Sequence, residues 1–142
     1  MKKFLKIFAT GLVAASLALT GCSTSSGDSG KKTEETKKDI KVGFLLSGPI
    51  TDGGYNFNHN KGRLYLEEQT GVETIYKESV KEDSAEVQKV VEDMISQGAN
   101  VIVGASFGFM DGMVASAKAH PDVKFLHGGG HQTADNLSNY FG

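Results

Sequence analysis

The sequence predicts an α/β fold, a doubly wound parallel sheet in three α/β/α layers. Two observations support this prediction. Short apolar runs alternate with amphipathic segments from Ile40 onward, and Gly residues or Pro121 stand at several of the junctions between them. Strands that alternate with helices pair in parallel through right-handed crossovers. The roughly 100 residues that follow Ile40 are enough for one core of this kind.

The expected elements alternate along the chain through at least four strands. Apolar residues recur at intervals of three and four between Ser84, which can cap a helix, and Gly98, which can end one, so this segment is the clearest helix. Residues 72–77 alternate between apolar and polar, which is typical of a strand nearer the sheet edge. The strands are expected at 40–46, 72–77, 101–103 and 123–127, with a candidate fifth at 137–141, and the other helices at 58–69 and 111–119.

Polar and aromatic side chains gather after the first expected strand, where Gly53 and Gly54 let the backbone turn sharply. Ligands of open parallel sheets bind at the carboxyl ends of the strands, where the strand order reverses. With the order 2-1-3-4-5, this crevice lies between the loops 47–56 and 105–111. The candidate ligand-binding residues are Asp52, Gly54, Tyr55, Asn56 and His59 in or beside the first loop, and Ser106, Phe107 and Asp111 in the second.

These roles have structural alternatives. Asp52 and Asp111 belong to a residue type that routinely forms turns and caps helices. Tyr55 and Phe107 suit packing as well as ligand contact. Neither loop has the Gly-x-Gly-x-x-Gly or the Walker spacing, and the first loop has no Lys to pair with a phosphate, so no nucleotide cofactor is expected.

The first 39 residues predict export and a membrane anchor. A positively charged start and a mostly apolar segment, 4–19, which is shorter than the roughly 20 residues of a spanning helix, predict a signal peptide at 1–21. Leu19-Thr20-Gly21-Cys22 resembles the lipobox of bacterial lipoproteins. That resemblance implies that Cys22 carries lipid and holds the protein on the extracytoplasmic face of the cell membrane. Residues 22–39 have no large apolar residue and are expected to form a disordered linker.

The charge balance argues against a nucleic-acid partner. The formal charge is −2, and it becomes −5 once residues 1–21, which hold three Lys and no acid, are removed. A protein with this balance does not attract a phosphate backbone. The single Cys also excludes a disulfide within the chain.

Two other chemistries fit parts of the sequence less well. The segment His127-Gly128-Gly129-Gly130-His131 invites a metal site, but three Gly prevent a helix from bringing both rings to one face, so no metal is expected. Gly104-Ala105-Ser106-Phe107-Gly108 fits the Gly-x-Ser-x-Gly elbow of serine hydrolases. Such enzymes need more strands ahead of the Ser, and residues 107–110 are expected as loop before the next helix. An enzyme is therefore not expected.

Several short motifs follow one another in a fixed order from Ile40 to the end of the chain. They are Lys41-Val42-Gly43-Phe44, Gly48-Pro49-Ile50, Asp52-Gly53-Gly54-Tyr55-Asn56, Ser106-Phe107-Gly108-Phe109-Met110-Asp111, Pro121-Asp122-Val123-Lys124-Phe125 and Thr133-Ala134-Asp135-Asn136. Together they resemble the basic membrane protein (BMP) family. Its members are substrate-binding lipoproteins of ABC importers, and some are purine-nucleoside receptors.

The resemblance implies the type I periplasmic-binding fold, in which two α/β lobes hinge around the ligand. Family members are more than twice as long as residues 22–142, so the chain is expected to hold the N-terminal lobe, 40–142, without the second lobe. The implied partners are a purine nucleoside and the permease and ATPase subunits of the importer.

The resemblance also assigns roles to single residues. Asp52 and Asn56 would supply polar contacts, Tyr55 would line the pocket, and Asp111 would reach the ligand. The nucleoside-binding branch tends to have Asp-Lys-Ser-Phe-Asn-Gln where residues 52–57 are Asp-Gly-Gly-Tyr-Asn-Phe. This difference leaves a free purine base or another small ligand as alternatives.

Overall fold

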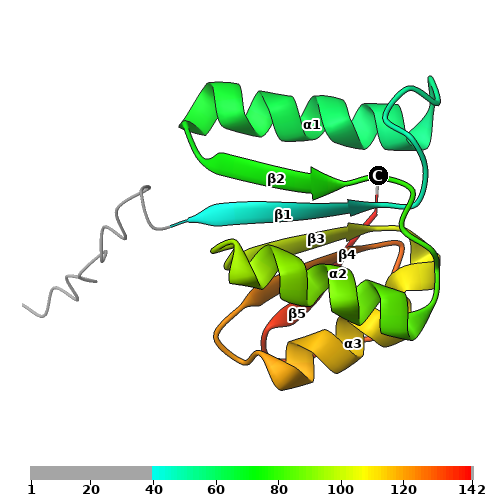
Figure 1. The fold of residues 1–142 in the computed structure, drawn as a ribbon, viewed down its shortest axis with the longest axis vertical. Coiled ribbons are helices and arrows are strands. Elements are labelled where there is room, and N and C mark those ends of the chain that lie inside the picture. The colour runs from blue at the N-terminus through cyan, green and yellow to red at the C-terminus, as the bar shows by residue number, and fades with distance from the viewer. Residues whose placement is uncertain (1–39, 142) are drawn as a thin grey trace, which may run out of the picture. The chain divides into compact units, whose positions relative to one another are not determined.

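The structure, a computed structural model, describes residues 40–141 (Figure 1). The predictions of a signal peptide at 1–21, a lipid on Cys22 and a linker at 22–39 concern residues outside this range. The strands are β1 (Lys41–Leu46), β2 (Glu73–Lys77), β3 (Val101–Ala105), β4 (Lys124–Gly128) and β5 (Leu137–Tyr140), and the helices are α1 (Tyr55–Thr70), α2 (Ser84–Ser96), the 3-10 helix η2 (Phe107–Phe109) and α3 (Met110–Ala119).

The five strands form one sheet in the order β2-β1-β3-β4-β5, and all four strand pairs are parallel. Helix α1 lies on one face of the sheet, and α2 and α3 lie on the other (Figure 1). The predicted fold class is therefore confirmed, and the strand order is the one assumed from the sequence. The order reverses between β1 and β3, which places the switch point where the sequence predicts it.

Helix α1 begins at Tyr55, three residues earlier than expected. The reason is local, because the carboxylate of Asp52 accepts the backbone N–H groups of Asn56 and Phe57. Tyr55 and Asn56 are thus part of the first turn and do not belong to the preceding loop.

The cap of α2 is likewise one residue earlier than expected. Asp83, and not Ser84, accepts the N–H groups of the second and third helical residues.

The segment 107–110, expected as loop, is instead helical. Helix η2 follows Ser106 directly and continues into α3 at Met110. The N–H of Phe109 donates to the carbonyl of Ser106 at 3.2 Å, and the Phe109 side chain is fully buried. Burial of this ring accounts for the tight helical turn immediately after β3.

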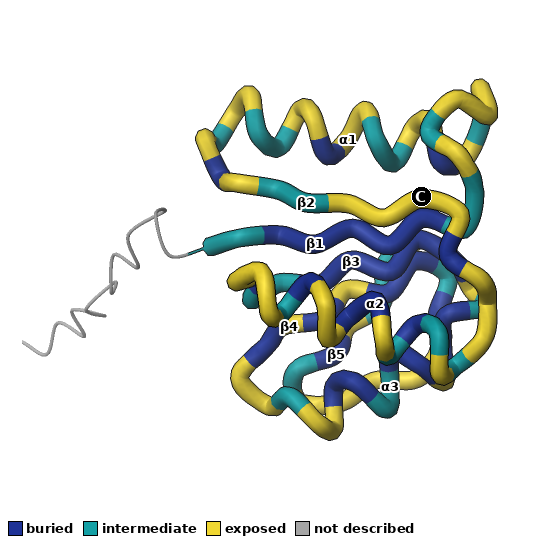
Figure 2. The backbone as a smooth tube through the Cα atoms, in the orientation of Figure 1, coloured by how far each residue is buried: buried dark blue, intermediate teal, exposed yellow. Residues whose placement is uncertain are grey.

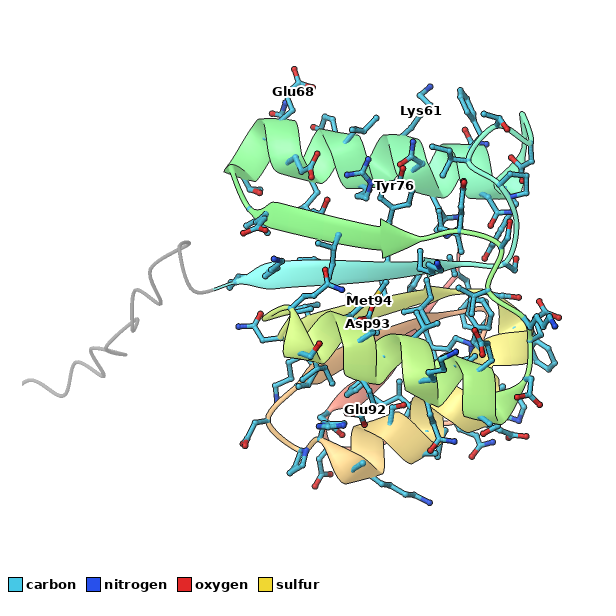
Figure 3. All side chains as sticks on the ribbon, viewed as in Figure 1. Lys61, Glu68, Tyr76, Glu92, Asp93 and Met94 are labelled. Carbon is cyan, nitrogen blue, oxygen red and sulfur yellow. The ribbon has the colours of Figure 1, made fainter. Side chains whose placement is uncertain are left out.

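The main core lies between the sheet and the pair α2 and α3. Its members come from alternate residues of the central strands and from the inner faces of both helices (Figure 2). Met94 points from α2 toward the sheet (Figure 3), where a Cβ on Gly43 would lie 2.7 Å from its sulfur. The two helices approach closely at Gly112, where a Cβ would lie 2.5 Å from side-chain atoms of Val87.

The other face of the sheet is covered less completely. Most of α1 is exposed or intermediate in burial (Figure 2), and Lys61 and Glu68 project away from the sheet (Figure 3). Polar contacts hold α1 to β2, because the Arg63 guanidinium donates to Thr74 Oγ1 at 2.9 Å and lies 4.7 Å from the ring centre of Tyr76. Within residues 40–141, no helix has the length and apolarity needed to cross a membrane.

Candidate functional site

Loops that follow the parallel strands meet at the carboxyl edge of the sheet. The loop after β2 lies beside the loop after β1, since the N–H of Val80 donates to Leu46 O at 3.0 Å and that of Ile50 to Glu78 Oε2 at 2.9 Å. The loop after β4 lies beside β5, because the N–H of Gly129 donates to Tyr140 O at 2.9 Å. This edge is the expected place for a ligand.

Asp52 is an exposed residue whose carboxylate is occupied by the protein itself. It accepts the backbone N–H groups of Gly54, Asn56 and Phe57 at 2.8–3.0 Å and the side-chain amide of Asn56 at 2.9 Å. These donors, the N–H of Gly54 foremost, lower the pKa of Asp52 to about 2. The arrangement is that of a helix cap. A ligand contact from Asp52 or Gly54 stays a prediction.

Asn56 is buried beneath this loop. Its Nδ2 donates to Asp52, and a Cβ on Gly48 would lie 2.6 Å from the same nitrogen, so the side chain is tightly enclosed. Its Oδ1 has no hydrogen-bond partner among residues 40–141. The carbonyl end of Asn56 is thus able to accept a hydrogen bond, and its role as a ligand contact stays a prediction.

Tyr55 and His59 line a groove, which we call the α1-side groove, together with Tyr140. The groove has a volume of about 690 Å³, and its floor includes Phe44, Val103 and Leu126, which pair across three neighbouring strands. Its remaining lining residues are Asn58, Gly62, Leu66, Gly128, Gly129 and Phe141. The rim is partly aromatic and the floor is apolar, so the groove is suited to an apolar occupant.

Hydrogen bonds fix the tautomer of the neutral His59 ring. Its Nδ1 lies 2.9 Å from the carbonyl of Tyr55 and must donate, because a carbonyl only accepts. The Nε2 then accepts from the hydroxyl of Tyr140 at 3.1 Å. Burial, with the nearby Tyr55 as a smaller cause, raises the pKa of Tyr140 to about 12, so the phenol keeps its proton.

Ser106 is buried at the end of β3, and both its hydroxyl and its backbone carbonyl are hydrogen-bonded. Its hydroxyl donates to the carboxylate of Glu82, and its carbonyl accepts from Nε2 of the fully buried His127 at 2.6 Å. Glu82 lies in the loop after β2, so its side chain reaches past the end of β1, which separates β2 from β3. In this geometry His127 contacts the backbone of Ser106 and not its hydroxyl.

The structure removes one of the two arguments made from the sequence against a serine hydrolase and adds another. Helix η2 does start directly after Ser106, so the argument from an intervening loop is wrong. The backbone of Ser106, however, is extended, with φ −166° and ψ 141°, unlike the strained turn of a nucleophile elbow. His127, the neighbouring histidine, bonds to the backbone carbonyl of Ser106 and not to its hydroxyl oxygen Oγ.

Phe107 is 62 % exposed at the same edge and stacks on His131, with ring centres 6.0 Å apart and planes inclined by 29°. Gly129 lies against the backbone of Phe107 with φ +75°, a conformation that favours Gly. Asp111, the last residue of the expected loop and the first of the expected helix, lies exposed in the first turn of α3, where a negative charge suits the helix N-terminus. Its contact with a ligand stays a prediction.

The eight predicted residues thus fall into separate groups. Asp52, Gly54 and Asn56 form the cap of α1, Tyr55 and His59 line the α1-side groove, Ser106 and Phe107 mark the end of β3, and Asp111 lies on α3.

The sequence analysis did not predict Glu82, His131 and Tyr140 as site residues. The place of Glu82 in the loop 78–83 after the second strand was the available signal, because that loop begins at the same sheet edge. Among residues 40–141, no group of His, Cys, Asp and Glu is placed to hold a metal.

The fold and the edge site define one lobe of the type I periplasmic-binding class. The solved structure of an ABC-transporter solute-binding protein from Conexibacter woesei shares this fold, with a TM-score of 0.64 and 20 % identity over 72 % of this chain and 35 % of that one. A family model described as "Bmp: ABC transporter substrate-binding protein PnrA-like" matches residues 39–142. The chain belongs to this Bmp family.

Two curated relatives are similar over the same extent of the chain. A purine-binding protein of Brucella abortus is 41 % identical over 106 residues, which cover 73 % of this chain and 30 % of the relative. A putative glucose-binding protein of an ABC transporter from Haloferax volcanii is 32 % identical over 104 residues, which cover 72 % and 26 %. The chain therefore spans less than a third of either relative.

Proposed function

We propose that this chain is a ligand-binding lobe of a substrate-binding protein that serves an ABC importer, and that its ligand is a purine base or nucleoside. The observation that carries the proposal is the 41 % identity to a purine-binding protein in a chain of the Bmp family. The geometry of the carboxyl edge supports it. Phe107 offers an exposed ring on which a flat heterocycle stacks, and Ser106 and Glu82 offer oxygen acceptors beside it.

A sugar is the second candidate ligand, because one relative is described as glucose-binding. The edge favours the purine, since the ring of Phe107 is exposed beside its acceptors and purines present both a flat face and N–H donors. We further propose that the lobe binds its ligand without catalysing a reaction on it. The hydroxyl of Ser106 donates to Glu82, and His127 does not contact this hydroxyl and so does not activate it as a nucleophile.

Nuclear magnetic resonance titration tests the ligand class. The chain from residue 22, with Cys22→Ser so that no lipid is attached, is titrated with adenine, adenosine and glucose. We expect adenine or adenosine to shift the amide signals of residues 106–108 and 129–131, with a dissociation constant of about 1 mM, because one lobe supplies only part of the contacts. Glucose should shift them less.

Two results contradict the proposal. The first is the absence of any shift at about 10 mM purine, and the second is stronger binding of glucose than of either purine at the same amides. Binding at about 1 µM or tighter would instead support the ligand class and show that one lobe is sufficient for recognition.

We also propose that Cys22 is lipidated and holds the protein on the extracytoplasmic face of the membrane. The support is the sequence Leu19-Thr20-Gly21-Cys22 after a charged and then apolar start. In a bacterial host, Cys22→Ala should move the protein from the membrane to the soluble fraction. Ser23→Ala, one residue further on, is the matched control and should stay with the membrane. A Cys22→Ala variant that still sediments with membranes contradicts the anchor.

A further inference from the structure

Glu82 is a residue of the carboxyl edge to which neither the sequence motifs nor the family resemblance gives a role. Its carboxylate accepts the hydroxyl of Ser106 and lies so close over Gly108 that a Cβ there would overlap it. It reaches this place from the loop after β2, across the end of β1. The contact therefore joins the two sides of the switch point, where the ligand is expected.

The contact decides how Ser106 can bond to a ligand. A carboxylate only accepts hydrogen bonds, so the single hydrogen of the Ser106 hydroxyl is committed to Glu82 Oε1. The lone pairs that remain on Ser106 Oγ accept. Among the described residues, the hydrogen bond of the Glu82 side chain is made through Oε1, and Oε2, which lies against Gly108, remains as a second acceptor. The pair thus presents two acceptors side by side and no donor.

Two neighbouring acceptors match a ligand group with two N–H donors on one atom. The exocyclic amino group of a purine is such a group, and Phe107, next to Ser106, supplies the ring on which the purine stacks. We propose that Glu82 determines specificity at this site by holding Ser106 as an acceptor, and that the pair selects amino-substituted purines. This inference rests on the proposed purine ligand.

The test compares adenine with 6-methylpurine, in which a methyl group of similar size replaces the amino group. In the same magnetic resonance titration, the parent chain should bind adenine about tenfold more tightly than 6-methylpurine. Glu82→Ala and Ser106→Ala should each abolish this preference, and the double variant should behave like either single variant, because both residues serve one contact. Gly108→Ala should also abolish it, because its Cβ would displace the Glu82 carboxylate while leaving both side chains present.

Glu86→Ala is the matched control, because it removes a carboxylate from the first turn of α2 and leaves the hydrogen bond between Ser106 and Glu82 in place. It should keep the preference for adenine. The outcomes distinguish failure of the proposed purine ligand from failure of the role of Glu82. If the parent chain binds neither of these bases and does not bind adenosine, the proposed function fails and the inference fails with it. If it binds both equally, or if Glu82→Ala keeps the preference with the fold intact, the inference is wrong while the purine ligand stands.

Discussion

Replacing Phe109 with Ala should lower the free energy of unfolding by about 3–5 kcal/mol. Phe109 is fully buried in the core beneath α2 and α3, and removal of the ring leaves a cavity under η2. Small domains are stable by only about 5–15 kcal/mol, so a large share of this chain's stability depends on one ring. Urea unfolding followed by circular dichroism measures the difference.

Phe107 provides a matched control two residues away in the same 3-10 helix. It is 62 % exposed, so Phe107→Ala should change the unfolding free energy by no more than about 0.5 kcal/mol. The same variant should weaken purine binding, because it removes the stacking ring. Equal destabilisation by the two substitutions would contradict the assignment of one ring to the core and the other to the site.

Adding a single methyl group at Gly112 should also destabilise the fold, by about 1–3 kcal/mol. The new Cβ would lie 2.5 Å from Val87 side-chain atoms and 3.1 Å from the carbonyl oxygen of Ser84, so α2 and α3 would be forced apart. Thermal unfolding of Gly112→Ala measures the effect. The penalty should shrink only in part in a Val87→Ala background, because that change removes Cγ1, one of the two Val87 atoms at 2.5 Å, and keeps Cβ, the other.

Gly62 is the control for helix propensity. It lies in α1, and a Cβ there would meet no atom within 4 Å. Gly62→Ala should therefore stabilise the protein by about 0.5–1 kcal/mol, through the lower backbone entropy of the unfolded chain. If Gly112→Ala were equally stabilising, the close packing of α2 against α3 would be wrong.

The architecture was predictable because its signals are local and periodic. The alternation of strands and helices and the three-and-four spacing in α2 follow from burial, whereas the residues of β2 do not alternate in burial. These signals do not determine the strand order, which was assumed as one of the few arrangements that right-handed crossovers allow. Helix starts were predicted less well. Asp52 and Asp83 cap from positions that precede the apolar periodicity, so periodicity alone places the start too late.

The site was only partly predictable for a related reason. Ser106 and Phe107 follow a strand, and a strand end is visible in the sequence. Glu82 reaches Ser106 from 24 positions away, and Tyr140 reaches His59 from 81 away, so neither contact has a local signature. Such partners depend on which loops cross the sheet edge, and that is a property of the folded chain.

The contacts at the carboxyl edge have a consequence for the entropy of binding. Glu82 bonds the hydroxyl of Ser106, and His127 bonds its carbonyl. Asp52 caps the start of α1, and the N–H of Gly129 donates to β5. These loops are already ordered before a ligand arrives, so association would lose rigid-body freedom but little further backbone freedom. If the proposed ligand binds at this edge, selection would use a shape that is already present, and a ligand that required the edge to rearrange would have to break hydrogen bonds, among them the buried bond from His127 to Ser106.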